Sequence, residues 1–456
     1  GNHLNTDVDT MNVTVANDTV YLTEKDAITV NIDKLLGEVK ATTLTVNANE
    51  IGEIGNHLNT DVDTMNVTVA NDTVYLTEKD AITVNIDKLL GEVKATTLTV
   101  NANEIGEIGN HLNTDVDTMN VTVANDTVYL TEKDAITVNI DKLLGEVKAT
   151  ELTVNANEIG EIGNHLNTDV DTMNVTVAND TVYLTEKDAI TVNIDKLLGE
   201  VKATTLTVNA NEIGEIGNHL NTDVDTMNVT VANDTVYLTE KDAITVNIDK
   251  LLGEVKATTL TVNANEIGEI GNHLNTDVDT MNVTVANDTV YLTEKDAITV
   301  NIDKLLGEVK ATDLTVNANS VGSATSYLNT EVEVLNAEVN TDIYLEEKDD
   351  LQIGTVNATN MKVISNSNIE NKDTTSLVKV DKLTIDALNV NLNTEIKTIN
   401  ANVVNDITIN EKDNLFGTII AEDLILDVAF STLLTDVETI TVNSSDSVYV
   451  TQIDDV

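Results

Sequence analysis

The amino-acid sequence predicts an all-β fold, a parallel β-helix (β-solenoid) with three coils in each 54-residue repeat. Three observations lead to this fold class. A phrase of 54 residues recurs almost unchanged six times. Each copy contains three segments in which apolar and polar residues alternate, the pattern of half-buried strands. The 456 residues include no Pro, which suits strands that must all donate backbone hydrogen bonds to a neighbour.

The near-identical repeats occupy residues 1–324, and the position of Thr43 becomes Glu151 in the third copy and Asp313 in the sixth. The six copies begin at Gly1, Gly55, Gly109, Gly163, Gly217 and Gly271. A period of this size is typical of solenoids, in which each unit buries its apolar face only against its neighbours. Residues 325–456 diverge but keep the same order of phrases. We therefore expect a divergent continuation of one solenoid and no separate second domain.

Each coil is defined by one alternating segment, and the first copy contains three: Thr43–Ala48, Met11–Val15 and Ala27–Ile32. Cutting the repeat at these segments gives coils of 21, 17 and 16 residues. Each coil also contains a second apolar patch. The three patches are Ile51 with Ile54, Val20 with Leu22, and Leu35 with Leu36 and Val39.

Aligning the three segments predicts which side chains stack from coil to coil. Two interior columns are expected: Leu44, Val13 and Ile28 in one, and Val46, Val15 and Val30 in the other. An outward column would consist of Thr45, Thr14 and Thr29. Stacked strands rise by about 4.8 Å per coil, so about 25 coils would form a rod of about 120 Å.

Composition and charge exclude several partners. The formal net charge is −53 and the sequence pI is about 4.1. Nucleic acids and anionic membrane surfaces are therefore not expected to bind, because both require basic side chains. No apolar run is long enough to cross a bilayer. The lack of Cys removes disulfides and thiolate metal sites. Both ends fall inside repeat phrases, so we expect the chain to be a fragment of a longer protein.

Four phrases of the repeat resemble a known family: Leu44-Thr-Val46, Ile51-Gly52, Leu58-Asn-Thr-Asp-Val62 and Val74-Tyr-Leu-Thr-Glu-Lys-Asp-Ala-Ile-Thr-Val84. Their order is similar to the β-strand repeats of large bacterial surface adhesins of the filamentous haemagglutinin type. The resemblance covers nearly the whole chain. It implies right-handed coils, export from the cell, and a shaft that presents binding regions at a distance. The near-identity of the copies favours a structural filament.

One His occurs in each copy of the repeat: His3, His57, His111, His165, His219 and His273. Equivalent positions lie three coils, or about 14 Å, apart, which is too far to share a metal ion, so we interpret these residues as structural. Asp7 and Asp9 could offer oxygen ligands to Ca²⁺. The spacing of known calcium loops is absent, and a solvated acidic turn is the favoured interpretation. Ca²⁺ is therefore only an alternative, and no cofactor is predicted.

Other recurring polar residues have structural interpretations. The outward Thr column could order water as an ice-binding face, but the neighbouring column would be irregular, with Thr43, Asn12 and Ala27. Asn12 and Asn17 begin N-glycosylation sequons, which a sequence rich in Asn and Thr produces by composition. Tyr21 is expected to anchor the corner of its coil. No residue is predicted to be catalytic, cofactor-binding or metal-binding.

These observations favour a structural or adhesive rod at the cell surface or secreted from the cell. We expect it to associate with itself into filaments or bundles and to contact cell surfaces or glycans. The alternative is a ligand-binding solenoid that uses its acidic or Thr-rich face for Ca²⁺ or ice. A glycan-acting β-helix enzyme is third, because only residues 325–456 are irregular enough for a cleft and they contain no His or Arg. The chain is therefore predicted not to be an enzyme.

Overall fold

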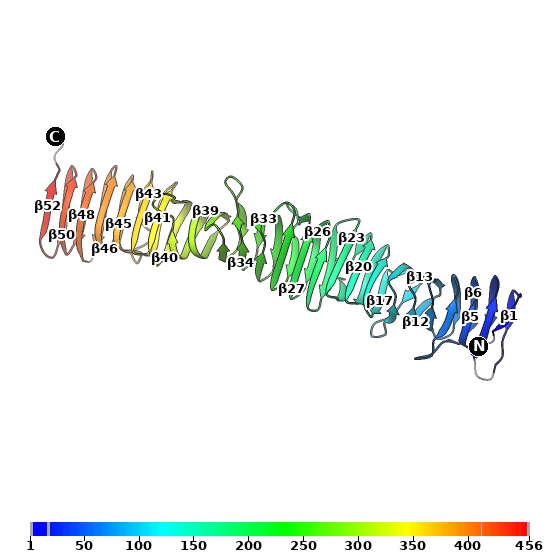
Figure 1. The fold of residues 1–456 in the computed structure, drawn as a ribbon. Coiled ribbons are helices and arrows are strands. Elements are labelled where there is room, and N and C mark those ends of the chain that lie inside the picture. Colours follow the sequence, from blue (N-terminus) through cyan, green and yellow to red (C-terminus); the bar gives the residue numbers. More distant parts are fainter. Residues whose placement is uncertain (1–2, 16–18, 412, 454–456) are drawn as a thin grey trace. The chain divides into compact units, whose positions relative to one another are not determined.

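The computed structural model describes residues 3–15, 19–411 and 413–453. Every regular element in these residues is a β-strand, and the strands are numbered β1 to β52 (Figure 1). The chain divides into two compact units, Gly1–Ala232 and Asn233–Val456. Each unit is a parallel β-solenoid, so the predicted fold class with three coils per 54-residue repeat is confirmed.

The second copy of the repeat illustrates the strands of all near-identical copies. Its strands are β8 (Leu58–Asp61), β9 (Thr64–Val69), β10 (Thr73–Glu78), β11 (Ala81–Asn85), β12 (Lys88–Lys94), β13 (Thr97–Ala102) and β14 (Glu104–Ile105). The third copy begins with β15 (Leu112–Asp115), β16 (Thr118–Val123) and β17 (Thr127–Glu132).

From Ala297 onward, β39, β40, β45 and β46 are longer than any strand of the earlier copies. The strands of this part are β39 (Ala297–Val321), β40 (Leu328–Val339), β41 (Asp342–Glu347), β42 (Leu351–Asn357), β43 (Asn360–Ser365), β44 (Asn368–Asn371), β45 (Leu377–Ala387), β46 (Asn389–Val403), β47 (Asp406–Glu411), β48 (Asn414–Ile420), β49 (Asp423–Val428), β50 (Phe430–Asp436), β51 (Thr439–Ser444) and β52 (Val448–Gln452). Figure 1 shows these strands side by side in yellow to red.

Successive strands alternate between two parallel ladders, except that β14 and β15 follow each other in the same ladder. In the second copy, β8, β10 and β12 stack in one ladder, and β9, β11 and β13 stack in the other. A parallel partner can be reached only after the chain has gone around a coil, so this alternation is the solenoid itself. Aliphatic side chains from both ladders fill the interior. Ile82, Leu98 and Val100, for example, are at most 2% exposed.

Two of the three predicted segments stack in the expected register. Ile28 pairs with Leu44 and Val30 pairs with Val46, while Thr29 pairs with Thr45 on the outside. These aliphatic residues are buried, as the interior columns require.

The segment Met11–Val15 departs from its predicted register, by four residues against the strand of Val30 and by two against the strand of Leu44. Met11, not Val15, pairs with Val30. Its equivalent Met65, not the counterpart of Val13, pairs with Leu44. The predicted coil lengths hold, because β9, β11, β13 and β16 begin at Thr64, Ala81, Thr97 and Thr118, which are 17, 16 and 21 residues apart. A shift of two or four residues keeps every side chain on the same face, and the alternating pattern therefore does not reveal it.

The prediction that Ile54 packs beside Ile51 is wrong. Ile51 is fully buried, but Ile54 is 82% exposed. Ile54 stands at the tip of a tight turn that a bridge between Glu53 and Asn56 closes. The copies of Ile54 at Ile108, Ile162, Ile216 and Ile270 are exposed in the same way. The remaining patch residues are buried: Val20, Leu22, Leu35, Leu36 and Val39.

This turn explains the longest coil. β12 pairs with β14 at an offset of 16 residues and with β15 at an offset of 21. The extra five residues form the excursion between β14 and β15, which begins at Gly106 and includes Gly109. Both glycines have positive φ, 67° and 76°. Their surroundings differ, because a Cβ on Gly106 would lie 2.1 Å from the Tyr129 carbonyl oxygen and one on Gly109 would contact nothing within 4 Å.

We predict that Gly106→Ala destabilises the solenoid far more than Gly109→Ala. Both variants place Ala in the left-handed region, which costs about 1–2 kcal/mol. Only Gly106→Ala also forces the next coil away, for about 1–3 kcal/mol more. Urea unfolding followed by circular dichroism measures the difference. Equal unfolding midpoints for the two variants would contradict the close approach.

Candidate binding groove

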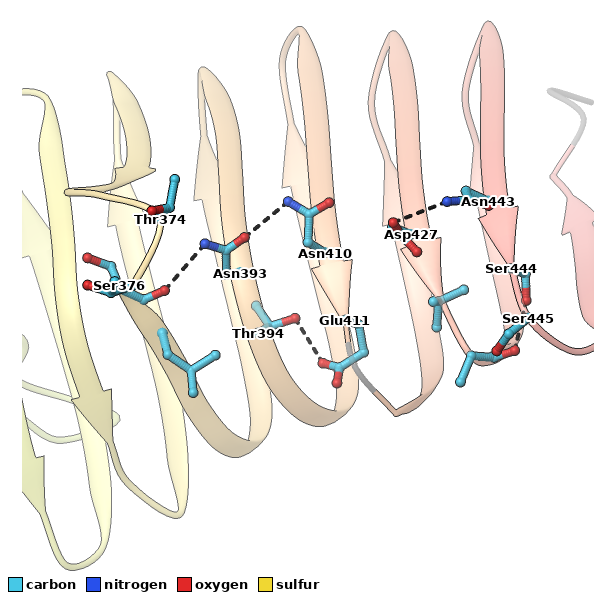
Figure 2. Close-up of a pocket in the computed structure, with 14 residues that line it drawn as sticks. Thr374, Ser376, Asn393, Thr394, Asn410, Glu411, Asp427, Asn443, Ser444 and Ser445 are labelled. Atoms are coloured by element: carbon cyan, nitrogen blue, oxygen red, sulfur yellow. Dashed lines mark hydrogen bonds between the residues drawn. The ribbon is translucent and has the colours of Figure 1, made fainter.

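The second unit contains a groove of about 620 Å³ that crosses successive coils (Figure 2). Its lining side chains come from β45, β46, β47, β49 and β51 and from the loop before β45. Most of them carry amide, hydroxyl or carboxylate groups. The groove therefore offers hydrogen-bonding groups across several coils.

Four polar side chains form a column in this groove: Asn393, Asn410, Asp427 and Asn443. They are direct partners in the ladder from β46 through β47 and β49 to β51. Asn410 Nδ2 donates a hydrogen bond to Asn393 Oδ1 at 3.1 Å. Asn443 Nδ2 donates to Asp427 Oδ2 at 3.2 Å. Each coil thus contributes one amide or carboxylate at the same place (Figure 2).

The floor of the groove is fixed by a buried carboxylate. Glu411 is 4% exposed and Thr394 is fully buried. Thr394 Oγ1 donates to Glu411 Oε2 at 2.8 Å, and the backbone N–H of Ile396 donates to the same oxygen at 2.8 Å. The N–H of Asp413 donates to Oε1 at 3.0 Å. These bonds hold the Glu411 side chain in place.

One wall is a loop that Asp373 organises. The N–H and hydroxyl of Thr375 donate to Asp373 Oδ1 at 2.8 and 2.6 Å, and the N–H of Ser376 donates at 3.0 Å. These hydrogen bonds, first that of the Thr375 hydroxyl, lower the pKa of Asp373. Asx turns of this kind give short loops a defined conformation. The wall is therefore preformed.

The recurring His and Tyr, which the sequence suggested separately, lie together. The rings of His57 and Tyr75 are 5.9 Å apart. His57 Nδ1 lies 3.1 Å from Thr77 Oγ1 and 3.3 Å from the Leu76 carbonyl oxygen, and Nε2 lies 3.4 Å from Glu92 Oε2. The His therefore connects three successive coils, which agrees with its structural interpretation.

No sequence motif predicted this hydroxyl–imidazole–carboxylate series, which resembles the order of groups in a catalytic triad. The Leu76 carbonyl can only accept a hydrogen bond. With a hydrogen on Nδ1, His57 donates to this carbonyl and acts as a hydrogen-bond donor between coils. The series has the contacts of a structural clamp between coils.

A buried Glu, which lies at a coil corner once in every repeat, was also not identified from the sequence. Glu78 is 5% exposed and accepts hydrogen bonds from the N–H groups of Val62 at 3.1 Å and Lys79 at 2.7 Å. Buried equivalents are Glu24, Glu132, Glu186, Glu240, Glu294, Glu347 and Glu411. The signal was present in the alternation, because Val74, Leu76 and Glu78 point to the same face.

The environment of this corner carboxylate differs along the chain. The hydroxyl of Thr6, 2.5 Å from Glu24 Oε2, lowers the pKa of Glu24. Burial instead raises the pKa of Glu347, which is 1% exposed. Both carboxylates accept backbone N–H groups, so both are structural acceptors.

The other predicted candidates are dispersed. Asp7 and Asp9 are exposed. Asn12 accepts a hydrogen bond from Asn31 at 2.5 Å, in an amide ladder. Asn17 lies outside the described residues. The outward Thr column is interrupted, because Thr99 pairs with Asn120.

A comparison of the chain with protein-family models, curated proteins and solved structures returned no match. In the described part of the chain, no helix has the length and apolarity needed to cross a membrane. Within the same residues, no group of three or more His, Asp or Glu is placed to hold a metal ion.

We predict that Glu347→Ala destabilises the second unit by about 2 kcal/mol, because it leaves buried hydrogen-bond donors without an acceptor. Glu347 accepts bonds from the Thr330 hydroxyl at 2.7 Å and from the N–H groups of Val332 at 3.3 Å and Lys348 at 2.9 Å. Denaturant unfolding and hydrogen exchange of these amides test this. The adjacent, exposed Glu346 provides the control, and Glu346→Ala should leave both unchanged. If the amides of Val332 and Lys348 were equally protected from hydrogen exchange in the two variants, the role of Glu347 as acceptor would be refuted.

Proposed function

We propose that the chain is a structural and adhesive component outside the cell, secreted or held at the cell surface. The observation that carries this proposal is the repeat: six near-identical copies fold into coils of the same register. Such a chain offers the same surface many times, whereas an enzyme needs one unique arrangement of groups. We therefore propose no catalytic role.

Stability in this proposal comes from stacking. Each buried Leu or Val contributes about 1.5–3 kcal/mol, and every coil adds the same interior again. Length can thus grow without a larger globular core. The large negative charge keeps such an element soluble and opposes close contact between copies at low salt. Self-association into filaments or bundles should therefore strengthen as ionic strength rises.

A ligand-binding role is the second candidate, and the groove beside Asn410 and Asp427 favours it. The ice-binding form of this role has less support, because Asn residues interrupt the outward Thr column. Ca²⁺ binding by the exposed acidic turns stays an alternative proposal.

The location is tested with an antibody raised against the purified chain. We expect intact cells of the source organism, or their culture medium, to react as strongly as lysed cells. A cytoplasmic protein serves as the lysis control. Labelling that appears only after lysis would refute an extracellular function.

The structural role is tested by electron microscopy of the native assembly, with calcium present and again after chelation. We expect thin filaments in both states, with an axial repeat of about 14 Å for three coils. Discrete particles would contradict a filament component. If the filaments fall apart on chelation, assembly depends on calcium, and the metal-independent structural role is refuted.

A further inference from the structure

We propose that the groove over β45–β51 binds an extended, uncharged polysaccharide that lies along the column of Asn393, Asn410, Asp427 and Asn443. This inference deepens the adhesive part of the proposed function by naming a ligand class. It is tested on the purified chain. If the chain binds no glycan, the proposed structural role is unaffected. The antibody test of location does not depend on glycan binding.

The spacing of the column points to a glycan. Its members are one coil apart, and coils are separated by about 4.8 Å. One sugar unit in an extended, β-linked chain has nearly this length, so successive units can meet successive side chains. An extended peptide advances by about 3.3 Å per residue and would fall out of step. A ligand that follows the column is therefore best matched by a polysaccharide.

The column has hydrogen-bonding groups of the kind that sugar hydroxyls need. An Asn amide has two N–H donors, and its oxygen can accept two hydrogen bonds. The bond from Asn410 to Asn393 uses one donor of Asn410, and the bond from Asn443 to Asp427 uses one donor of Asn443. The second N–H of each amide and the remaining lone pairs of Asp427 can serve a ligand. Hydroxyl groups both donate and accept, and so complement such a row.

The charge of the groove selects against anionic glycans. Glu411 and Asp427 line it, and none of the fourteen described lining residues is a Lys. The chain as a whole carries −53. Carboxylated or sulfated sugars would therefore be repelled, and an uncharged chain of hydroxyl-bearing units is favoured.

The groove is prepared for its ligand before binding. The Asp373 loop fixes one wall, and the bonds between Thr394 and Glu411 fix the floor. A site that is already ordered loses less conformational entropy when it binds. Hydrogen bonds to an exposed polar groove can then yield measurable affinity.

The test is calorimetric titration of the purified chain with β-1,4-linked glucose oligomers of two to six units. The column spans three coil spacings, about 14 Å, so affinity should rise up to about four units and then level off. Oligogalacturonate, which is anionic, and the curved α-1,4-linked glucose series should bind at least about tenfold more weakly. Equal affinity for the dimer and tetramer, or no binding by any β-linked oligomer, would overturn the proposal.

Two variants assign binding to this groove. Asn410→Ala and Asp427→Ala should each weaken tetramer binding about tenfold, the loss of one or two hydrogen bonds. Asn402→Ala is the matched control, because Asn402 is exposed and donates to Asp386 at 3.4 Å outside the groove. It should bind as the parent chain does. Affinity unchanged in both groove variants would place the glycan elsewhere and refute the site.

Discussion

The structure depends on the backbone hydrogen bonds between each coil and its two neighbours. These bonds run from coil to coil and leave side chains free to point inward or outward. The interior then needs only aliphatic groups of similar size, such as Ile82, Leu98 and Met119 in successive coils. Where the backbone departs from the regular coil, the neighbouring coil limits the size of the side chain that can be accommodated. Gly106 meets that limit because it lies against the backbone of Tyr129.

Polar groups enter the interior where they satisfy the backbone. Glu78 and its counterparts accept N–H groups at a corner that the strand ladder cannot serve. His57 contacts groups on the two following coils. These residues fix the corners, while the outward columns are free to vary. The divergent coils use that freedom, and a groove lined by Asn410 and Asp427 is the result.

The alternating pattern predicted the coils and much of their stacking, such as Ile28 on Leu44. It placed Met11 four residues out of register with Val30, because a period of two is unchanged by even shifts. It also took Ile54 for a core residue, since hydrophobicity alone ignores the flanking glycines that mark a turn. The groove could not be predicted, because its column residues lie 16 or 17 positions apart in a sequence without near-identical copies and meet only through the ladder.

The repeat contains a whole number of coils, three in 54 residues. Any event that adds or removes a complete repeat changes the number of coils by three. Each such event connects a position in one repeat to the equivalent position in another. Every strand therefore keeps a parallel partner, and every interior residue still points inward. A deletion that removes only part of a coil would leave strands without their parallel partners. The architecture thus lets inheritance alter the size of the protein in fixed steps while the fold stays intact.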